Sequence, residues 1–192
     1  MLPNLLIAFG LLLAAAGVWL KFRSAPEPAP VEVAAAPKQS PEEKGRAFEN
    51  WVVSHLSKQH HVLKDWRSDK VAPNGTYAES NKYPDVQVAL SLHGKEYPFA
   101  MECKWRNSFM GANVDISEAQ LGRYRNFERE QKMPVFLVLG IGGQPNAPNE
   151  LYCIPLRNLP PGLLDMRSLA PFRQKMTSNV FYYDAFAKEL RL

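Results

Sequence analysis

Residues 83–106 constrain the fold of this chain more than any other stretch. Over residues 85–92, apolar side chains occupy every second position, which is the period of a strand with one buried face. His93-Gly94 interrupts the pattern, and a second alternating stretch then runs over residues 95–106. Turn-forming residues between two alternating stretches are typical of a tight turn. The sequence therefore predicts two adjacent β-strands joined by a short connection.

The second of these strands carries its apolar side chains on one face and charged side chains on the opposite face. Its large apolar residues share one face, whereas Glu102 and Lys104 lie on the other. Asp85 opens the neighbouring strand and brings a second carboxylate. Charges in such a sheet are costly to bury unless they are paired or bind a metal. Two carboxylates from adjacent strands suit a hard cation such as Mg²⁺, and a lysine beside them can orient the attacking water.

The order Pro84-Asp85, a turn, and then Glu102-x-Lys104 resembles the PD-(D/E)XK nuclease superfamily. The resemblance implies a restriction-endonuclease-like fold and metal-dependent hydrolysis of phosphodiester bonds in DNA. It implies that Asp85, Glu102 and Lys104 are catalytic, and that Asp85 and Glu102 bind Mg²⁺ or Mn²⁺. The backbone carbonyl of Cys103, between two site residues, is the expected third oxygen ligand. In a chain with 22% charged residues, an ordinary ion pair between Glu102 and Lys104 is the alternative interpretation.

A capping box marks the start of the first helix of the globular part. Ser40 is placed as the N-cap, Pro41 follows in the first turn, and Glu43 stands at the third helical position. From Phe48 onward, apolar residues recur at helical spacing, and Glu49 lies at the edge of that apolar face. In the superfamily, a glutamate of the first helix often reaches toward the metal. The resemblance therefore implies Glu49 as a further ligand, and a solvated glutamate is the alternative.

A second helix is expected from Ser117 to Lys132, with Gln120 and Tyr124 one turn apart on it. This Gln-x-x-x-Tyr spacing is similar to a motif in the RecB-type exonuclease branch of the superfamily. There, the two residues lie beside the active site and help to hold the DNA backbone. A tyrosine packed in the core of an amphipathic helix is the alternative. Further phosphate contacts are expected from nearby basic residues, namely Lys70, Arg106, Arg123 and Arg125.

The remaining segments complete an α/β architecture. The apolar run over residues 134–143 suits a strand that is covered on both faces. Further strands are predicted at residues 60–66 and 150–156, loops at 71–82 and 107–115, and a closing helix at 183–192. The sequence therefore predicts a mixed central β-sheet with helices on its faces, as in the restriction-endonuclease-like fold.

The chain begins with a predicted transmembrane helix. Residues 2–20 carry no charged side chain and approach the length that spans a bilayer. Lys21 and Arg23 follow at once, so the positive-inside rule places the C-terminal side in the cytoplasm. A cleaved signal peptide is the alternative, but it would have a basic start and a shorter apolar stretch. Residues 21–40 form a Pro/Ala-rich linker, and residues 41–192 are expected to form the nuclease-like domain.

The mildly basic composition fits an anionic partner, because the net charge is +4 over 192 residues. Cys103 and Cys153 lack the spacing of metal-binding cysteines and suit buried free thiols. The sequence thus predicts a single-pass inner (cytoplasmic) membrane protein whose nuclease domain meets DNA in the cytoplasm, with a homodimer left open. The alternative is a catalytically inactive domain of the same fold that binds DNA or a protein partner at the membrane.

Overall fold

The computed structural model describes residues 39–67, 83–108, 113–114, 116–159 and 164–192. The chain divides into two units, Met1–Lys38 and Gln39–Leu192. All described residues belong to the second unit, and the predicted anchor belongs to the first. Within the described ranges, no helix has the length and apolar character needed to cross a membrane. The predicted anchor at residues 2–20, most of the linker and Lys70 lie outside those ranges.

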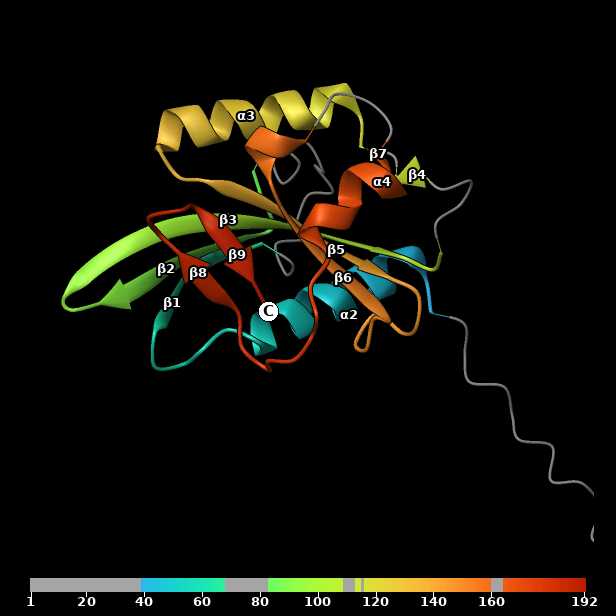
Figure 1. The fold of residues 1–192 in the computed structure, drawn as a ribbon, viewed down its shortest axis with the longest axis horizontal. Helices are drawn as coiled ribbons and strands as arrows, with labels where there is room; N and C mark the ends of the chain where they lie inside the picture. The colour runs from blue at the N-terminus through green and yellow to red at the C-terminus, as the bar shows by residue number, and fades with distance from the viewer. Residues whose placement is uncertain (1–38, 68–82, 109–112, 115, 160–163) are drawn as a thin grey trace, which may run out of the picture. The chain divides into compact units, whose positions relative to one another are not determined.

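A five-stranded mixed sheet forms the centre of the second unit, in the order β1-β2-β3-β5-β6 (Figure 1). The strands β3 and β5 are parallel, and the other neighbouring strands are antiparallel. The bounds are β1 His61–Trp66, β2 Val86–Leu92, β3 Lys95–Arg106, β5 Val135–Ile141 and β6 Glu150–Pro155. This arrangement confirms the predicted mixed α/β architecture and is consistent with a restriction-endonuclease-like fold.

The predicted turn between β2 and β3 is observed. His93 and Gly94 have positive φ angles of 50° and 74°, which is the backbone conformation of a two-residue hairpin turn. The turn sets the register of the two strands, so that Val86 lies opposite Met101 at the far end. The strand β5 is buried along its whole length, as expected for a strand that is covered on both faces.

Two helices cover opposite faces of the sheet: α2, Pro41–Ser54, and α3, Glu118–Gln131 (Figure 1). The predicted capping box of α2 is observed, and a serine side chain also caps α3. The Ser40 hydroxyl accepts the Glu43 N–H at 3.1 Å, and the Glu43 carboxylate accepts the Ser40 N–H at 2.7 Å. The Ser117 hydroxyl accepts the Gln120 N–H at 3.2 Å. The capping box therefore located the start of α2, and the predicted start of α3 at Ser117 lies one residue before the observed one.

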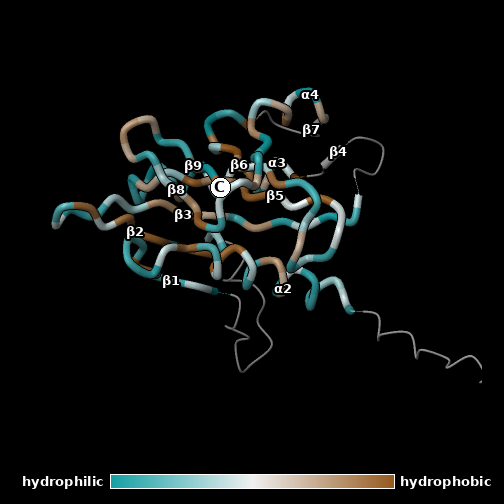
Figure 2. Tube along the Cα trace, turned by 60° about the horizontal axis from the view of Figure 1, so that its bottom comes forward, coloured by the Kyte–Doolittle hydropathy of each residue, from teal (hydrophilic) through white to brown (hydrophobic). Residues whose placement is uncertain are grey.

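Each face of the sheet has its own hydrophobic core, and Figure 2 shows hydrophobic residues concentrated along the strands. On the α2 side, Phe48 packs so closely on β5 that a Cβ added at Gly140 would lie 2.5 Å from its ring. On the α3 side, Leu121, Tyr124 and Phe127 pack against the other face of the same strands. The charged residues Glu102 and Lys104 lie on β3, the central strand between these two layers.

The C-terminal segment corrects a prediction, because residues 183–192 are not a helix. They form a hairpin of β8, Tyr182–Asp184, and β9, Glu189–Arg191. Tyr183, Leu190 and Leu192 are buried in the core on the α2 side. Alternate strand residues point to the same face, so a hairpin can bury all three of these side chains.

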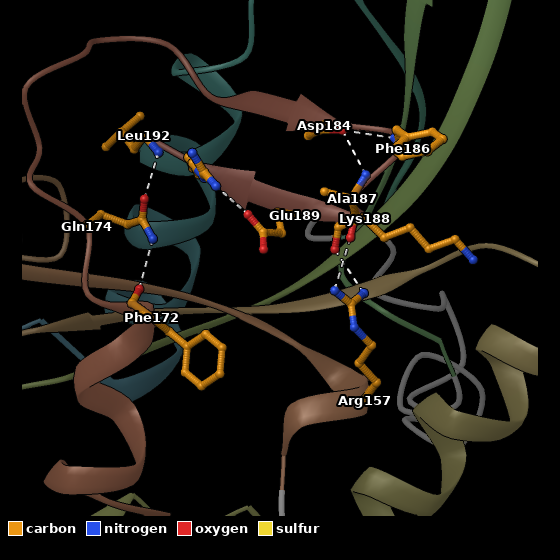
Figure 3. A network of polar contacts seen from close by, with 10 residues as sticks. Arg157, Phe172, Gln174, Asp184, Phe186, Ala187, Lys188, Glu189 and Leu192 are labelled. Carbon is orange, nitrogen blue, oxygen red and sulfur yellow. Dashed lines mark hydrogen bonds and ion pairs between the residues drawn. The ribbon is translucent and has the colours of Figure 1, made fainter.

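Side-chain hydrogen bonds hold the turn of this hairpin (Figure 3). The Asp184 carboxylate accepts the N–H groups of Phe186 and Ala187 at 2.9 and 2.8 Å. The Arg157 guanidinium donates to the carbonyl oxygens of Lys188 and Ala187 at 2.9 and 3.2 Å. The hairpin is thus tied to the segment that follows β6.

Short elements fill the rest of the second unit. A two-residue strand, β4, Asn113–Val114, pairs with β7, Leu164–Asp165. The prediction of a plain loop at residues 107–115 is therefore corrected at β4, where a partner distant in sequence supplies the pairing. The remaining elements are η3 Leu156–Asn158, α4 Met166–Leu169 and η4 Ala170–Phe172.

Candidate active site

Asp85 and Glu102 lie beside each other where β2 begins. Since Val86 is paired with Met101 in antiparallel register, the residue before Val86 is next to the residue after Met101. The Cys103 N–H donates to Asp85 Oδ2 at 2.8 Å, which holds this carboxylate against β3. The two carboxylates singled out in the sequence are therefore brought together by the hairpin register.

Glu102 is a buried charged residue with only 5% of its surface exposed. Its Oε1 atom accepts a hydrogen bond from Gln120 Nε2 at 3.1 Å and lies 3.2 Å from Lys104 Nζ. Its Oε2 atom is buried and has no hydrogen-bond partner within the described part of the chain. Because a buried carboxylate oxygen without a partner is costly, this position favours a bound cation.

The Gln-x-x-x-Tyr pair of α3 supports Glu102 from the side opposite to α2. Gln120 Nε2 donates to both Glu102 and the Tyr124 hydroxyl, the latter at 2.8 Å. Tyr124 is only 4% exposed, and burial together with the Glu102 charge raises the pKa of its hydroxyl, which stays protonated. The two residues thus lie beside Glu102, while the Tyr124 ring also packs in the core.

Negative charge is concentrated around Asp85. Burial, followed by the nearby carboxylates of Glu102 and Glu49, raises the pKa of Asp85 well above its usual range. The Cys103 N–H and the Lys104 ammonium act in the opposite direction. Glu49 belongs to α2, so charge from the α2 layer and from the sheet acts at this one place. A divalent cation would relieve that accumulation.

The oxygen atoms present fit a cation with few protein ligands. No group of three His, Cys, Asp or Glu side chains in the described ranges is placed to hold a metal ion. However, Mg²⁺ is usually bound through one or two carboxylates and keeps several waters. Asp85 and Glu102 supply such a pair.

The carbonyl of Cys103 is placed to add a third oxygen. Ala100 N donates to Pro134 O, and Gly142 N donates to Arg106 O, each at 2.9 Å. Even-numbered residues of β3 therefore direct their backbone groups toward β5, and Cys103 directs its own toward β2. At this level β2 has not yet begun, and Asp85 takes its place. The Cys103 thiol packs on the α2 side, and burial with the nearby carboxylates raises its pKa.

The predicted phosphate-binding residues differ in their exposure and in their contacts. Arg106 is exposed at the end of β3, and Arg123 is half-buried on α3. Arg125 donates to the carbonyl of Leu159 at 2.8 Å, so its guanidinium ties α3 to the segment after η3. Lys70 lies outside the described residues.

Sequence reasoning did not assign a role to two neighbours of this cluster, Arg67 and Tyr83. The Arg67 guanidinium lies over the Tyr83 ring, 4.2 Å from its centre, and Arg67 N donates to the Asp85 carbonyl at 3.0 Å. An aromatic residue directly before Pro84-Asp85 was the available signal for Tyr83. No local pattern pointed to Arg67, which is far from Asp85 in the sequence.

No family model and no curated protein matches this chain. Among solved structures, the chain is similar to the Holliday junction resolvase Hjc of Archaeoglobus fulgidus. The TM-score is 0.46 and the sequence identity 15%, over 65% of this chain and 89% of that chain.

Proposed function

We propose that this protein is a metal-dependent nuclease of the PD-(D/E)XK type that hydrolyses phosphodiester bonds in DNA. The observation that carries the proposal is the environment of Glu102. This buried carboxylate lies beside Asp85, is oriented by Gln120 and Lys104, and keeps one oxygen without a hydrogen-bond partner among the described residues. An ordinary strand ion pair needs neither the second carboxylate nor the glutamine.

Each residue of the site has a distinct role in this proposal. Mg²⁺ or Mn²⁺ bound to Asp85, Glu102 and the Cys103 carbonyl would acidify water and neutralise charge on the scissile phosphate. Lys104 orients the attacking water and stabilises the negative charge that develops in the transition state. Gln120 holds Glu102 in position. Glu49, whose charge acts on Asp85, is the further candidate ligand from α2.

The experiment compares DNA cleavage and metal binding in the full-length protein, purified in detergent. We expect the parent protein to cleave DNA with Mg²⁺ and not with EDTA. Asp85→Asn and Glu102→Gln are expected to lose both cleavage and calorimetrically measured binding of Mg²⁺. Lys104→Ala is expected to keep most metal binding and to lose about 10²-fold or more in cleavage, as is usual for an electrostatic or proton-handling group.

A matched control is available on the same sheet. Lys64 and Glu96 form an exposed ion pair between strands, with a distance of 2.8 Å. Lys64→Ala should leave cleavage and metal binding at the parent level. If Lys104→Ala also cleaves like the parent, or if Asp85→Asn binds Mg²⁺ unchanged, the site assignment is wrong. DNA binding without cleavage in the parent would favour the catalytically inactive alternative.

The proposal also includes a membrane tether at residues 2–20, supported by their apolar sequence and by Lys21 and Arg23 directly after them. The nuclease domain would then lie in the cytoplasm, at the inner membrane. A reporter fused after Leu192 should be active in the cytoplasm, and activity on the other side of the membrane would contradict this orientation. A homodimer stays a prediction, to be tested by the mass of the detergent-solubilised protein.

A further inference from the structure

Tyr83 and Arg67 form a stacked pair to which the proposed hydrolysis assigns no role. The Arg67 guanidinium carbon lies 4.2 Å from the centre of the Tyr83 ring, which is cation–π geometry. Asp65 Oδ2 accepts a hydrogen bond from Arg67 Nε at 2.7 Å and balances its charge. Tyr83 is nonetheless 38% exposed. Part of this braced tyrosine is therefore accessible to a ligand.

This pair is attached directly to the candidate active site. Arg67 N donates to the carbonyl oxygen of Asp85 at 3.0 Å, and Tyr83 precedes Asp85 by two residues. The Tyr83 ring meets Phe127 of α3 edge-on, with 5.9 Å between ring centres. The same helix carries Gln120, which binds Glu102. The pair thus adjoins the Asp85 backbone and packs against α3, the helix that also reaches Glu102.

We propose that the Tyr83–Arg67 pair is a stacking subsite for an unpaired nucleobase next to the phosphate that is cleaved. The inference rests on the proposed nuclease function and adds a substrate class, namely DNA with unstacked nucleotides at the cut rather than uninterrupted duplex. Every base has a π face, so a subsite of this kind requires an accessible base and reads no particular sequence.

Two physical features of the pair support this assignment. Phe127 and the guanidinium already restrict the Tyr83 ring, so stacking of a base costs little side-chain entropy. Since Asp65 pairs with Arg67, the subsite adds no uncompensated positive charge. Its contribution to DNA affinity should therefore leave the salt dependence unchanged, unlike that of a phosphate-binding arginine.

The test uses the full-length protein in detergent, with EDTA present so that DNA binding is measured without cleavage. Two DNA duplexes of one sequence each carry a single 2-aminopurine, which is paired in one and lies in a single-stranded gap in the other. We expect the parent protein to bind the gapped DNA about 10-fold more tightly and to quench its 2-aminopurine fluorescence.

Three variants separate stacking from a structural role. Tyr83→Leu keeps an apolar contact with Phe127 but has no aromatic face, and it should lose the roughly 10-fold preference with an unchanged salt slope. Tyr83→Trp should retain the preference. Tyr97→Leu is the matched control, because Tyr97 is 36% exposed but stands at the opposite end of β3 from Glu102. Its preference should equal that of the parent.

The possible results distinguish this subsite from the nuclease function itself. Equal affinity of the parent for the two DNAs would refute the subsite and leave the proposed hydrolysis intact. The subsite would also be refuted, with the hydrolysis intact, if Tyr83→Leu kept the preference for gapped DNA. Loss of that preference in a folded Tyr83→Trp variant would have the same meaning. Absence of both DNA binding and cleavage in the parent would refute the two proposals together.

Discussion

Replacing Asp85 by asparagine should stabilise the metal-free protein, even though it removes a proposed metal ligand. Burial and the carboxylates of Glu102 and Glu49 raise the pKa of Asp85. A carboxyl group with a higher pKa in the folded state binds its proton more tightly there. Stability therefore falls as the pH rises from the unfolded-state pKa through the folded-state pKa. Above that window, ionised Asp85 opposes folding to its full extent.

The size of the effect follows from the strand register. Side chains opposite each other in an antiparallel pair have Cβ atoms about 5 Å apart, which brings the Asp85 and Glu102 carboxylates to within about 6 Å. At an effective dielectric constant of about 20, two like charges at this separation repel by about 3 kcal/mol. The Lys104 ammonium and the Cys103 N–H offset part of this repulsion in the parent protein. The hydrogen bond from the Cys103 N–H can persist in the variant, because an asparagine side-chain oxygen also accepts it.

We therefore expect Asp85→Asn to raise the free energy of unfolding by about 1–2 kcal/mol at neutral pH in EDTA. For a unit of this size, that corresponds to an increase in Tm of about 2–8 °C. The assay is calorimetric unfolding of the full-length protein with EDTA and with millimolar Mg²⁺. Because a ligand of the folded state raises Tm, Mg²⁺ should stabilise the parent and leave the variant unchanged.

Asp65→Asn provides a control of opposite sign. Asp65 pairs with Arg67 at 2.7 Å, so neutralising it should lower Tm, and the response to Mg²⁺ should persist. A lower Tm for Asp85→Asn in EDTA would refute the argument that charge repulsion is stored at the site. A preserved response to Mg²⁺ in that variant would refute the ligand role of Asp85.

Three further outcomes can be measured on other parts of the protein. Arg106→Gln should lower the log–log salt slope of DNA binding by about 1, because its exposed guanidinium donates to the carbonyl of the adjacent Trp105 and joins no distant segment in that bond. Arg125→Gln should not lower it, because the Arg125 guanidinium is held by the Leu159 carbonyl at 2.8 Å and ties α3 to the segment after η3. Gly140→Ala should destabilise the fold by about 1–3 kcal/mol through its clash with α2, while Gly122→Ala, which has open space on α3, should stabilise it by about 0.5–1 kcal/mol. Burial raises the pKa of Cys153, so its thiol should resist alkylation until the protein is unfolded, and rapid labelling of the native protein would contradict this.

Local chemistry was sufficient to predict most of the regular elements. The Ser40 capping box located α2, because a cap satisfies backbone groups within a few residues of itself. The spacing of apolar residues along one side located α3. His93-Gly94 located the hairpin turn, since both residues accept positive φ angles. Side-chain alternation assigned Glu102 and Lys104 to one face of β3, which is a property of the strand period alone.

Tertiary pairing decided what local patterns could not. The C-terminal hairpin replaced the predicted helix because the core on the α2 side takes up Tyr183, Leu190 and Leu192. The register of β2 on β3 placed Asp85 beside Glu102 and against the Cys103 N–H. The packing of α3 supplied Gln120 to the same carboxylate. The residue types of the site were thus determined by the sequence. Their convergence, and the presence of Arg67 and Tyr83 beside them, depended on contacts between segments far apart in the chain.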